Sequence, residues 1–467
     1  MKKQFVHAIF CAPTGAYTDK GFPSRLTDEV FGALKSVGIN RIFAFGYDNR
    51  KETIEKTYEL CEKYGIMYFP TPGTAEDYLR ILPGENGEKP YGELTEAEKA
   101  DLDERFLTEV ETMTSHPAFG GVFFCDEAGY LAADGIAAAK RAFDTRFADY
   151  EFHVNFYSYS IDEGIFWGGM GGRMPDALPF KLEGDLEIKF ENRFHYYDKL
   201  VEHLLSKADF EYFSQDKYPY ECFWPTVPTS VHVALFELNA YFNQKKKKYG
   251  NKFYNYMQVG QWDGSGREMT FGEMALQMHV TAAYGSEGFA YFPGCYPLDF
   301  AGGENQAKAK AGGSALIDLA GNPTVYCDWI CELNRFFGNI EEDILSCRHL
   351  GVEACGTYQN GFTEEEIKAL PDNECIFRGE IPELLRYESK IKVEADNEVL
   401  ISVFERDGKK RYYVVNLSTV YANQVRLALP EHIYEVVTQT DTAIENGLLD
   451  IKLTAGSAAY IIEKQEK

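Results

Sequence analysis

The chain has 467 residues, with 47 Lys and Arg against 73 Asp and Glu, giving a formal net charge of −26. Such a charge would repel nucleic acids and anionic membranes, so neither is expected as a partner. Hydrophobic content of 45% and charged content of 26% are typical of a soluble globular protein, and the length suits two domains.

Eight short runs of β-branched and aromatic residues, each followed by a helix-like segment, fill the chain up to about residue 340. Eight β-then-α units predict an α/β fold of the (β/α)8 TIM-barrel type, which places its chemistry at the carboxyl ends of the strands. The predicted strands are Phe5–Pro13, Arg41–Asn49, Ile66–Gly73, Gly120–Tyr130, Phe152–Tyr159, Phe210–Tyr220, Phe253–Gln261 and Gly288–Pro297.

Helix signals lie between these runs. Apolar residues at three-to-four spacing predict a helix over Leu26–Val37, which Gly38 ends. Thr270 and Glu273 fit a capping box that opens a later helix.

The pattern changes after about residue 345, where short alternating runs and the turn Asp407-Gly408 predict an antiparallel β-sandwich. We therefore expect a catalytic barrel over residues 1–345 and an accessory sandwich over 346–467. The predicted strands are Ile391–Ala395, Val399–Glu405, Arg411–Leu417, Gln424–Leu429, Tyr434–Thr438, Leu448–Leu453 and Ala458–Ile462.

The ten cysteines have no paired spacing, which favours free thiols in a reducing compartment. We expect a cytoplasmic protein, or a secreted one if a leader has been removed. No run of apolar residues is long enough to span a membrane. The histidines are dispersed and no HExxH, GxGxxG or Walker pattern occurs, so no metal and no cofactor are expected. The oligomeric state is left open.

Carboxylates follow two of the predicted strands. Asp126 and Glu127 end the apolar run that begins at Gly120, and Asp216 ends the run that begins at Phe210. Unpaired burial of a carboxylate is costly, so such residues at a barrel mouth favour catalysis. The alternative is a structural role, with one carboxylate paired to a barrel arginine such as Arg41, or with Asp216 forming a turn.

Amides, hydroxyls and aromatic rings near the same strand ends suit recognition of sugar hydroxyls and stacking on sugar faces. The candidate substrate-binding residues are Tyr47, Asp48, Asn155, Tyr157, Trp167, Tyr218, Trp224, Gln258, Trp262 and Tyr291.

Four stretches carry a family resemblance over about residues 5–340: "SVGIN", "FFCDEAGY", "DKYPY" and "REMTFGEMALQMHVTAAYGSEGFAYFPGCYP". Together they resemble the clan A-like glycoside hydrolases of the (β/α)8-barrel superfamily. The resemblance implies that Glu127 is the acid/base. It also implies a glutamate nucleophile at the end of strand seven, where this chain has Gln258. Asp216, Asp263 or Glu268 could then supply the second carboxylate.

The resulting hypothesis is a glycoside hydrolase that cleaves O-glycosidic bonds of a carbohydrate substrate with a carboxylate pair, Glu127 and Asp216. The long loops Ile161–Lys189 and Phe300–Ala320 would wall the barrel mouth, so we expect action on a small oligosaccharide or a chain end. The alternative is a non-catalytic carbohydrate-binding barrel, which Gln258 motivates. A metal-dependent aldolase or isomerase is disfavoured by the dispersed histidines.

Overall fold

The computed structural model describes residues 4–15, 18, 21–44, 50–157, 163–169, 193–216, 218–220, 233–260, 269–296, 315–355, 385–429, 434–438, 442–445 and 448–464.

Eight parallel strands form one sheet in the order β3-β2-β1-β8-β7-β6-β5-β4. The two outer strands of this order also meet, because Tyr68 N donates to Ala118 O at 2.7 Å and Gly120 N donates to Tyr68 O at 3.0 Å. The predicted TIM barrel is therefore confirmed. Its strands are β1 (Val6–Ile9), β2 (Arg41–Phe43), β3 (Met67–Phe69), β4 (Gly121–Asp126), β5 (Glu151–Phe156), β6 (Tyr212–Gln215), β7 (Lys252–Gln258) and β8 (Gly288–Phe292).

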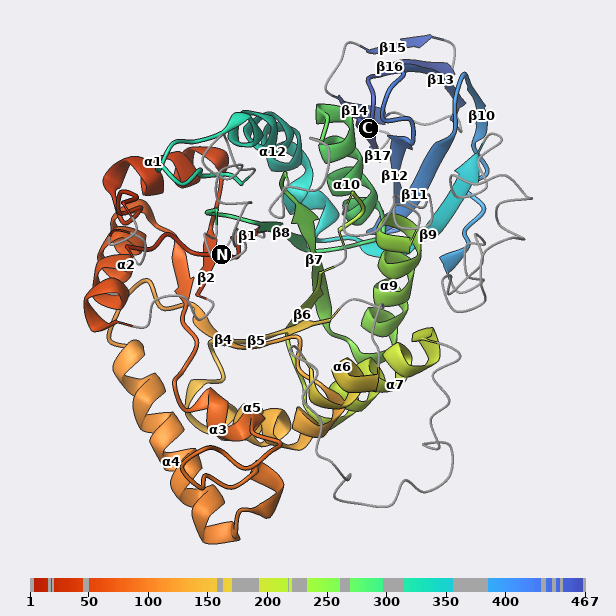
Figure 1. Ribbon diagram of the computed structural model, residues 1–467. Coiled ribbons are helices and arrows are strands. Elements are labelled where there is room, and N and C mark those ends of the chain that lie inside the picture. The colour runs from red at the N-terminus through yellow and green to blue at the C-terminus, as the bar shows by residue number, and fades with distance from the viewer. Residues whose placement is uncertain are drawn as a thin grey trace.

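Helices surround this barrel (Figure 1). Gly38 ends the first helix with φ 98°, and the capping box of Thr270 and Glu273 opens α10, both as predicted. The helices are α1 (Asp28–Val37), α2 (Lys51–Tyr64), α3 (Ala75–Leu79), α4 (Glu96–Met113), α5 (Ala133–Phe147), α6 (Glu163–Gly168), α7 (Arg193–Lys207), α9 (Leu238–Tyr249), α10 (Phe271–Ala283) and α12 (Val325–Ile344).

The barrel strands bury both of their faces. One cluster gathers alternate side chains from β1, β2, β3, β4, β7 and β8, among them Ala8, Phe43 and Phe123, and fills the interior. The intervening side chains, such as Ile42 and Phe124, join a larger core with the surrounding helices. The alternation along each strand therefore decides which side chains point into the barrel.

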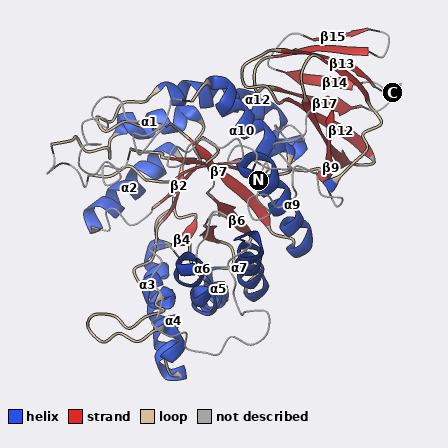
Figure 2. Cartoon of the chain, turned by 45° about the vertical axis from the view of Figure 1, so that its right-hand side comes forward, coloured by secondary structure: helices blue, strands red, loops and turns tan. Residues whose placement is uncertain are grey.

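Within the described residues, nine strands follow the barrel and form two antiparallel sheets, as the predicted β-sandwich requires; Figure 2 shows them gathered at one side of the barrel. The sheet orders are β10-β13-β16-β15 and β14-β17-β12-β11-β9. The strands are β9 (Arg348–Cys355), β10 (Lys392–Ala395), β11 (Val399–Arg406), β12 (Lys409–Asn416), β13 (Asn423–Ala428), β14 (Tyr434–Thr438), β15 (Thr442–Glu445), β16 (Leu448–Leu453) and β17 (Ala458–Glu463). Neither β9 nor β15 was predicted from the sequence.

Buried polar contacts join the five-stranded sheet to the barrel. Arg411 binds Asp343 through two contacts, Nε to Oδ2 at 2.9 Å and Nη2 to Oδ1 at 3.1 Å. The His279 ring of α10 lies 2.6 Å from the Tyr413 hydroxyl. The two parts thus share one packed interface, and a domain boundary at residue 345, between α12 and β9, stays a prediction.

The described cysteines and helices bear on the expected location of the protein. All eight cysteines in the described ranges are free thiols. No helix among the described residues is long and apolar enough to cross a membrane.

Candidate active site

Asp126 is the last residue of β4 and lies at the mouth of the barrel. The strand before it is buried, whereas Asp126 itself is half-buried. Burial raises the pKa of its carboxyl to about 7, and a hydrogen bond from Asn155 Nδ2 to Asp126 Oδ1 at 2.8 Å opposes that rise. Asp126 therefore exchanges a proton near neutral pH, which suits general acid or base work.

Glu127 follows Asp126 in a sharp turn. Its φ of 49° lies in the left-handed region, which costs a non-glycine residue about 1–3 kcal/mol. Its backbone N–H donates to Asn155 O at 2.9 Å. Residues 167–169 press against this turn so closely that a Cβ on Gly169 would lie 2.5 Å from Glu127 O. The turn thus holds the buried Glu127 in one place beside Asp126.

Asp216 follows β6, and Tyr256 on β7 connects it to the other two carboxyl groups. The Tyr256 side chain is 2% exposed, and its hydroxyl makes no hydrogen bond within the described part of the chain. Burial raises the pKa of Tyr256, and the charges of Asp126, Asp216, Cys11 and Glu127 raise it further. All three carboxyl groups therefore lie near one buried hydroxyl at the mouth.

The sequence analysis did not single out Tyr256. A signal was present, because Tyr254, Tyr256 and Gln258 alternate along β7 and so share one face of the strand. The interior cluster contains both tyrosines, which fixes that face as the inward one.

The barrel arginine Arg41 does not bind either carboxylate at the end of β4. It forms an ion pair with Glu151 at the start of β5 instead, and its guanidinium lies over the rings of Phe69 and Tyr212, at 5.3 and 5.1 Å from their centroids. Asp126 and Glu127 are therefore not the structural partners of Arg41.

Two further predicted site residues adjoin the mouth but are engaged with the protein. The Tyr218 ring stacks on Phe292 of the interior cluster, with centroids 5.2 Å apart. Gln258 Oε1 accepts from Tyr220 N at 2.7 Å, while its Nε2 donates to Gly260 O at 3.2 Å. Gln258 thus holds the chain after β6 against β7.

Three other predicted site residues have their rings in the protein core or against it. Trp167 is fully buried, packing edge-on against Phe166 and Tyr130, and its contact with a substrate stays a prediction. Tyr157, after β5, is half-buried against the same large core. The structure does not bring Tyr291 to the carboxylates, because its hydroxyl lies 3.1 Å from His7 Nδ1 on the helix-facing side.

The remaining predicted positions lie outside the described residues. They are Tyr47, Asp48, Trp224 and Trp262, the alternative carboxylates Asp263 and Glu268, and most of the two long loops.

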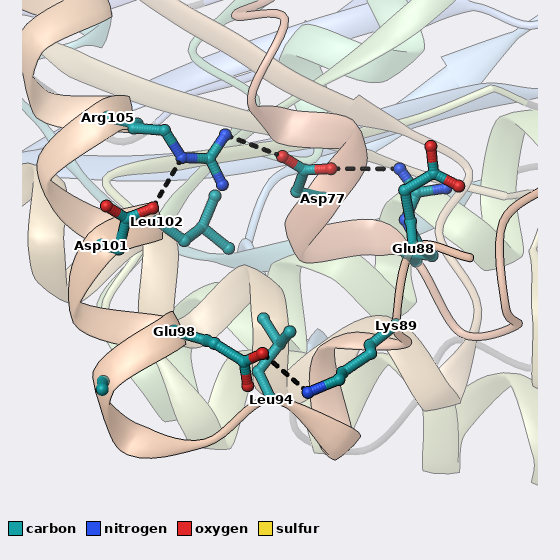
Figure 3. A pocket seen from close by; sticks show the side chains of 10 residues that line it. Asp77, Glu88, Lys89, Leu94, Glu98, Asp101, Leu102 and Arg105 are labelled. Atoms are coloured by element: carbon teal, nitrogen blue, oxygen red, sulfur yellow. Dashed lines mark hydrogen bonds and ion pairs between the residues drawn. The ribbon is translucent and has the colours of Figure 1, made fainter. Parts of the chain in front are cut away.

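A pocket of about 540 Å³ lies between α3 and α4, and none of the predicted site residues lines it. In Figure 3, Arg105 binds Asp77 and Asp101, and Lys89 binds Glu98. Its charges are thus paired with one another. Within the described ranges, no group of three His, Cys, Asp or Glu side chains could hold a metal ion.

The fold and the mouth carboxylates define a (β/α)8 barrel with added β-sheets. Neither a protein-family model nor a curated protein sequence matches the chain. Among solved structures, the chain is similar to a cold-adapted β-galactosidase from Rahnella sp. R3, at 11% identity and a TM-score of 0.51, over 99% of this chain and 98% of that one. It is also similar to a catalytic mutant of Gan42B, a GH42 β-galactosidase from G. stearothermophilus, at 10% identity and a TM-score of 0.50, over 100% and 99%. At such identity the likeness shows a shared fold alone, the (β/α)8 barrel that the sequence predicts.

Proposed function

We propose that the chain is a glycoside hydrolase that cleaves O-glycosidic bonds of a small oligosaccharide or a chain end. The observation that carries this proposal is the placement of Asp126 and Glu127 at the end of β4 and of Asp216 directly after β6, on either side of β5, whose Asn155 binds Asp126. Glycoside cleavage needs one carboxyl group that donates a proton and a second that acts as nucleophile or base. The shared fold with two β-galactosidases supports the same class.

The end of β4 supplies the acid in this proposal. Glu127 is the acid/base implied by the sequence resemblance and would protonate the leaving oxygen, and Asp126 beside it, whose pKa burial raises to about 7, is the alternative group for this role. Asp216, directly after β6, would attack the anomeric carbon or activate the water that does so.

The second candidate is a carbohydrate-binding barrel without catalysis. The observation that favours it is Gln258, which occupies the region where the resemblance implies a glutamate nucleophile and which is bound to Tyr220 N and Gly260 O. Binding to a glycan array without release of free sugar from the bound glycan would support this candidate over the hydrolase.

The test is a panel of aryl glycosides assayed with wild type and with Asp126→Asn, Glu127→Gln and Asp216→Asn. We expect the loss of the acid, by Glu127→Gln or Asp126→Asn, and the loss of the second carboxylate, by Asp216→Asn, each to lower activity by roughly 10²–10⁴-fold. This is the usual effect of removing a positioned acid or base. The control is Glu104→Gln, whose partner is Arg146 on the surface. If wild type is active and all three mouth variants keep more than about a tenth of its rate, the assignment is wrong.

The product profile from a polymeric substrate tests the proposed action at chain ends. Steady release of mono- or disaccharide is expected of a walled pocket. Early appearance of mixed mid-length oligosaccharides would contradict it.

A further inference from the structure

A hydrogen-bond chain runs through the interior of the barrel and ends on Asp126. The Tyr254 hydroxyl lies 3.0 Å from His153 Nδ1, and His153 Nε2 lies 2.9 Å from Ser214 Oγ. Ser214 Oγ lies 2.7 Å from Asn155 Oδ1, and Asn155 Nδ2 lies 2.8 Å from Asp126 Oδ1. The residues come in order from β7, β5, β6, β5 and β4, so the hydrogen bonds link four strands between the base and the mouth.

The hydrogens between Asp126 and His153 have one consistent arrangement. The ionised Asp126 can only accept, so Asn155 turns its amide N–H toward it and its oxygen toward Ser214. Ser214 then donates its single hydrogen to that oxygen and must accept from His153. The proton of the neutral His153 ring therefore sits on Nε2, while its Nδ1 lies 3.0 Å from the Tyr254 hydroxyl and 3.4 Å from Glu151 Oε1.

The histidine in the chain is neutral, as this arrangement requires. Burial lowers the pKa of His153, although the neighbouring Glu151 works against that change. The far end of the chain is fixed, because Tyr254 also lies 3.4 Å from Glu151 Oε1 and Arg41 binds the same Glu151. Tyr254, His153 and Ser214 are all fully buried, so they act on a substrate only through other residues.

We propose that this chain sets the protonation of Asp126, and that Ser214 and His153 are positioning residues for the reaction at the barrel mouth. Donors aligned in one direction polarise one another and strengthen the last bond in the series, here the bond from Asn155 to the Asp126 carboxylate. The consequence for catalysis rests on the proposed function, whereas the effect on the carboxyl group does not.

The neighbouring carboxyl groups oppose the ionisation of Asp126 when they are themselves ionised, because like charges repel. Glu127 is the next residue and Asp216 follows β6, whereas the buried Cys11 thiol has a raised pKa and stays neutral, with Arg25 as the cation that acts on it. Among the described contacts, the hydrogen bond from Asn155 is the one that lowers the pKa of Asp126. Loss of its support should therefore move the carboxyl group toward the protonated form.

Ser214→Ala tests the chain without touching Asn155 or Asp126. Asn155 Oδ1 then loses its donor, and its amide is free to turn that oxygen toward a protonated Asp126. We expect the midpoint of the Asp126 carboxyl titration to rise by roughly 0.5–1 pH unit. Infrared spectroscopy follows the protonated carboxyl band, and its absence in Asp126→Asn assigns it.

The β-sandwich offers a matched control. Ser402 is fully buried and lies 3.0 Å from Nε2 of His349, which is also buried, but neither residue is connected to Asp126 in the described structure. Ser402→Ala removes an equal hydroxyl from an equal His–Ser pair. It should leave the Asp126 midpoint where it is in wild type.

The tautomer of His153 is the second measurement, made by ¹⁵N NMR of the histidine-labelled protein with one histidine variant for assignment. A neutral ring with the proton on Nε2 between pH 6 and 8 (roughly the window set by an ordinary imidazole) supports the chain. A proton on Nδ1, an unchanged midpoint in Ser214→Ala, or an equal shift in Ser402→Ala overturns the proposal. Neither measurement uses a substrate, so their failure is distinct from a failure of the hydrolase assignment.

Discussion

Glu151 and Asp126 are carboxyl groups of one barrel that lie at opposite ends of the interior hydrogen-bond chain. Their surroundings shift their pKa values in opposite directions. Burial alone would raise the pKa of Glu151, but the charge of Arg41 outweighs it, so the pKa is lowered. At Asp126 burial is opposed by the amide of Asn155, and the pKa rises to about 7.

The difference separates a carboxylate that supports the fold from one that suits chemistry. A partner cation fixes Glu151 as an anion over the physiological range, and the pair joins β2 to β5 at the base of the barrel. An amide partner leaves Asp126 able to bind and release a proton near neutral pH, as a general acid must. Perturbed carboxyls of the second kind are the better guides to a functional site.

The largest effect is expected from Arg41→Met, which keeps a long side chain between the rings of Phe69 and Tyr212 but removes the charge. Glu151 would then be buried without a cation, and breaking a buried ion pair in this way costs about 3–5 kcal/mol of unfolding free energy. Urea unfolding at pH 8 measures it. The loss should shrink as the pH falls toward 5, because the uncompensated carboxyl has a raised pKa and takes up a proton.

Arg426→Met is the control for this substitution. Arg426 pairs with Glu394 and Asp450 on the surface of the sandwich, where an ion pair contributes about 0–1 kcal/mol. Equal losses from Arg41→Met and Arg426→Met would show that the Arg41–Glu151 ion pair contributes no more to the unfolding free energy than a surface ion pair does.

Much of the fold could be predicted from the sequence, because it depends on strong local patterns. All eight barrel strands begin within two residues of their predicted starts, and the turn at Asp407-Gly408 adopts positive φ at both positions. The strand β9 was missed. It mixes apolar and charged residues at the end of the long α12, and its partner β11 lies about fifty residues further along the chain.

The site could be predicted only where residues end a buried run, as Asp126 and Asp216 do. Which face of a barrel strand points inward is set by pairing with neighbouring strands, and the sequence does not fix it. In β8 the inward residues are Ala290 and Phe292, so Tyr291 points out. The polar alternation Glu-Phe-His-Val-Asn over 151–155 was the available signal for the interior hydrogen-bond chain.

Two substitutions that replace a carboxyl group by an uncharged amide sharpen the comparison, because each should change how the unfolding free energy depends on pH. Asp126 has a folded pKa of about 7, against about 3.9 when unfolded, so the folded state binds the extra proton between these values and wild type loses stability as the pH rises through them. Asp126→Asn removes this loss. We expect the variant to be more stable than wild type by about 1–3 kcal/mol at pH 8, less at pH 5.

Glu151→Gln should act in the opposite direction. The lowered folded pKa of Glu151 contributes stability that is present above its unfolded pKa and lost as the pH falls through the folded one. The substitution should cost about 1–3 kcal/mol at pH 8, and the cost should disappear in acid. Urea unfolding of both variants from pH 8 down to well below the ordinary carboxyl value of about 4 measures both signs. Parallel curves for the two variants would contradict the assignment of different roles.

The smallest change in stability is expected from Tyr256→Phe, for which Tyr254→Phe two residues earlier on β7 is a matched control. The Tyr256 hydroxyl makes no hydrogen bond among the described residues, so its removal breaks no contact and should change the unfolding free energy by less than about 0.5 kcal/mol. The Tyr254 hydroxyl lies 3.0 Å from His153 Nδ1 and 3.4 Å from Glu151 Oε1, and its removal leaves buried polar groups without this partner, at about 1–3 kcal/mol. Equal losses in urea unfolding would mean that Tyr256 has a structural partner after all. A stable Tyr256→Phe protein that loses glycosidase activity would instead show that this hydroxyl is kept free for the substrate.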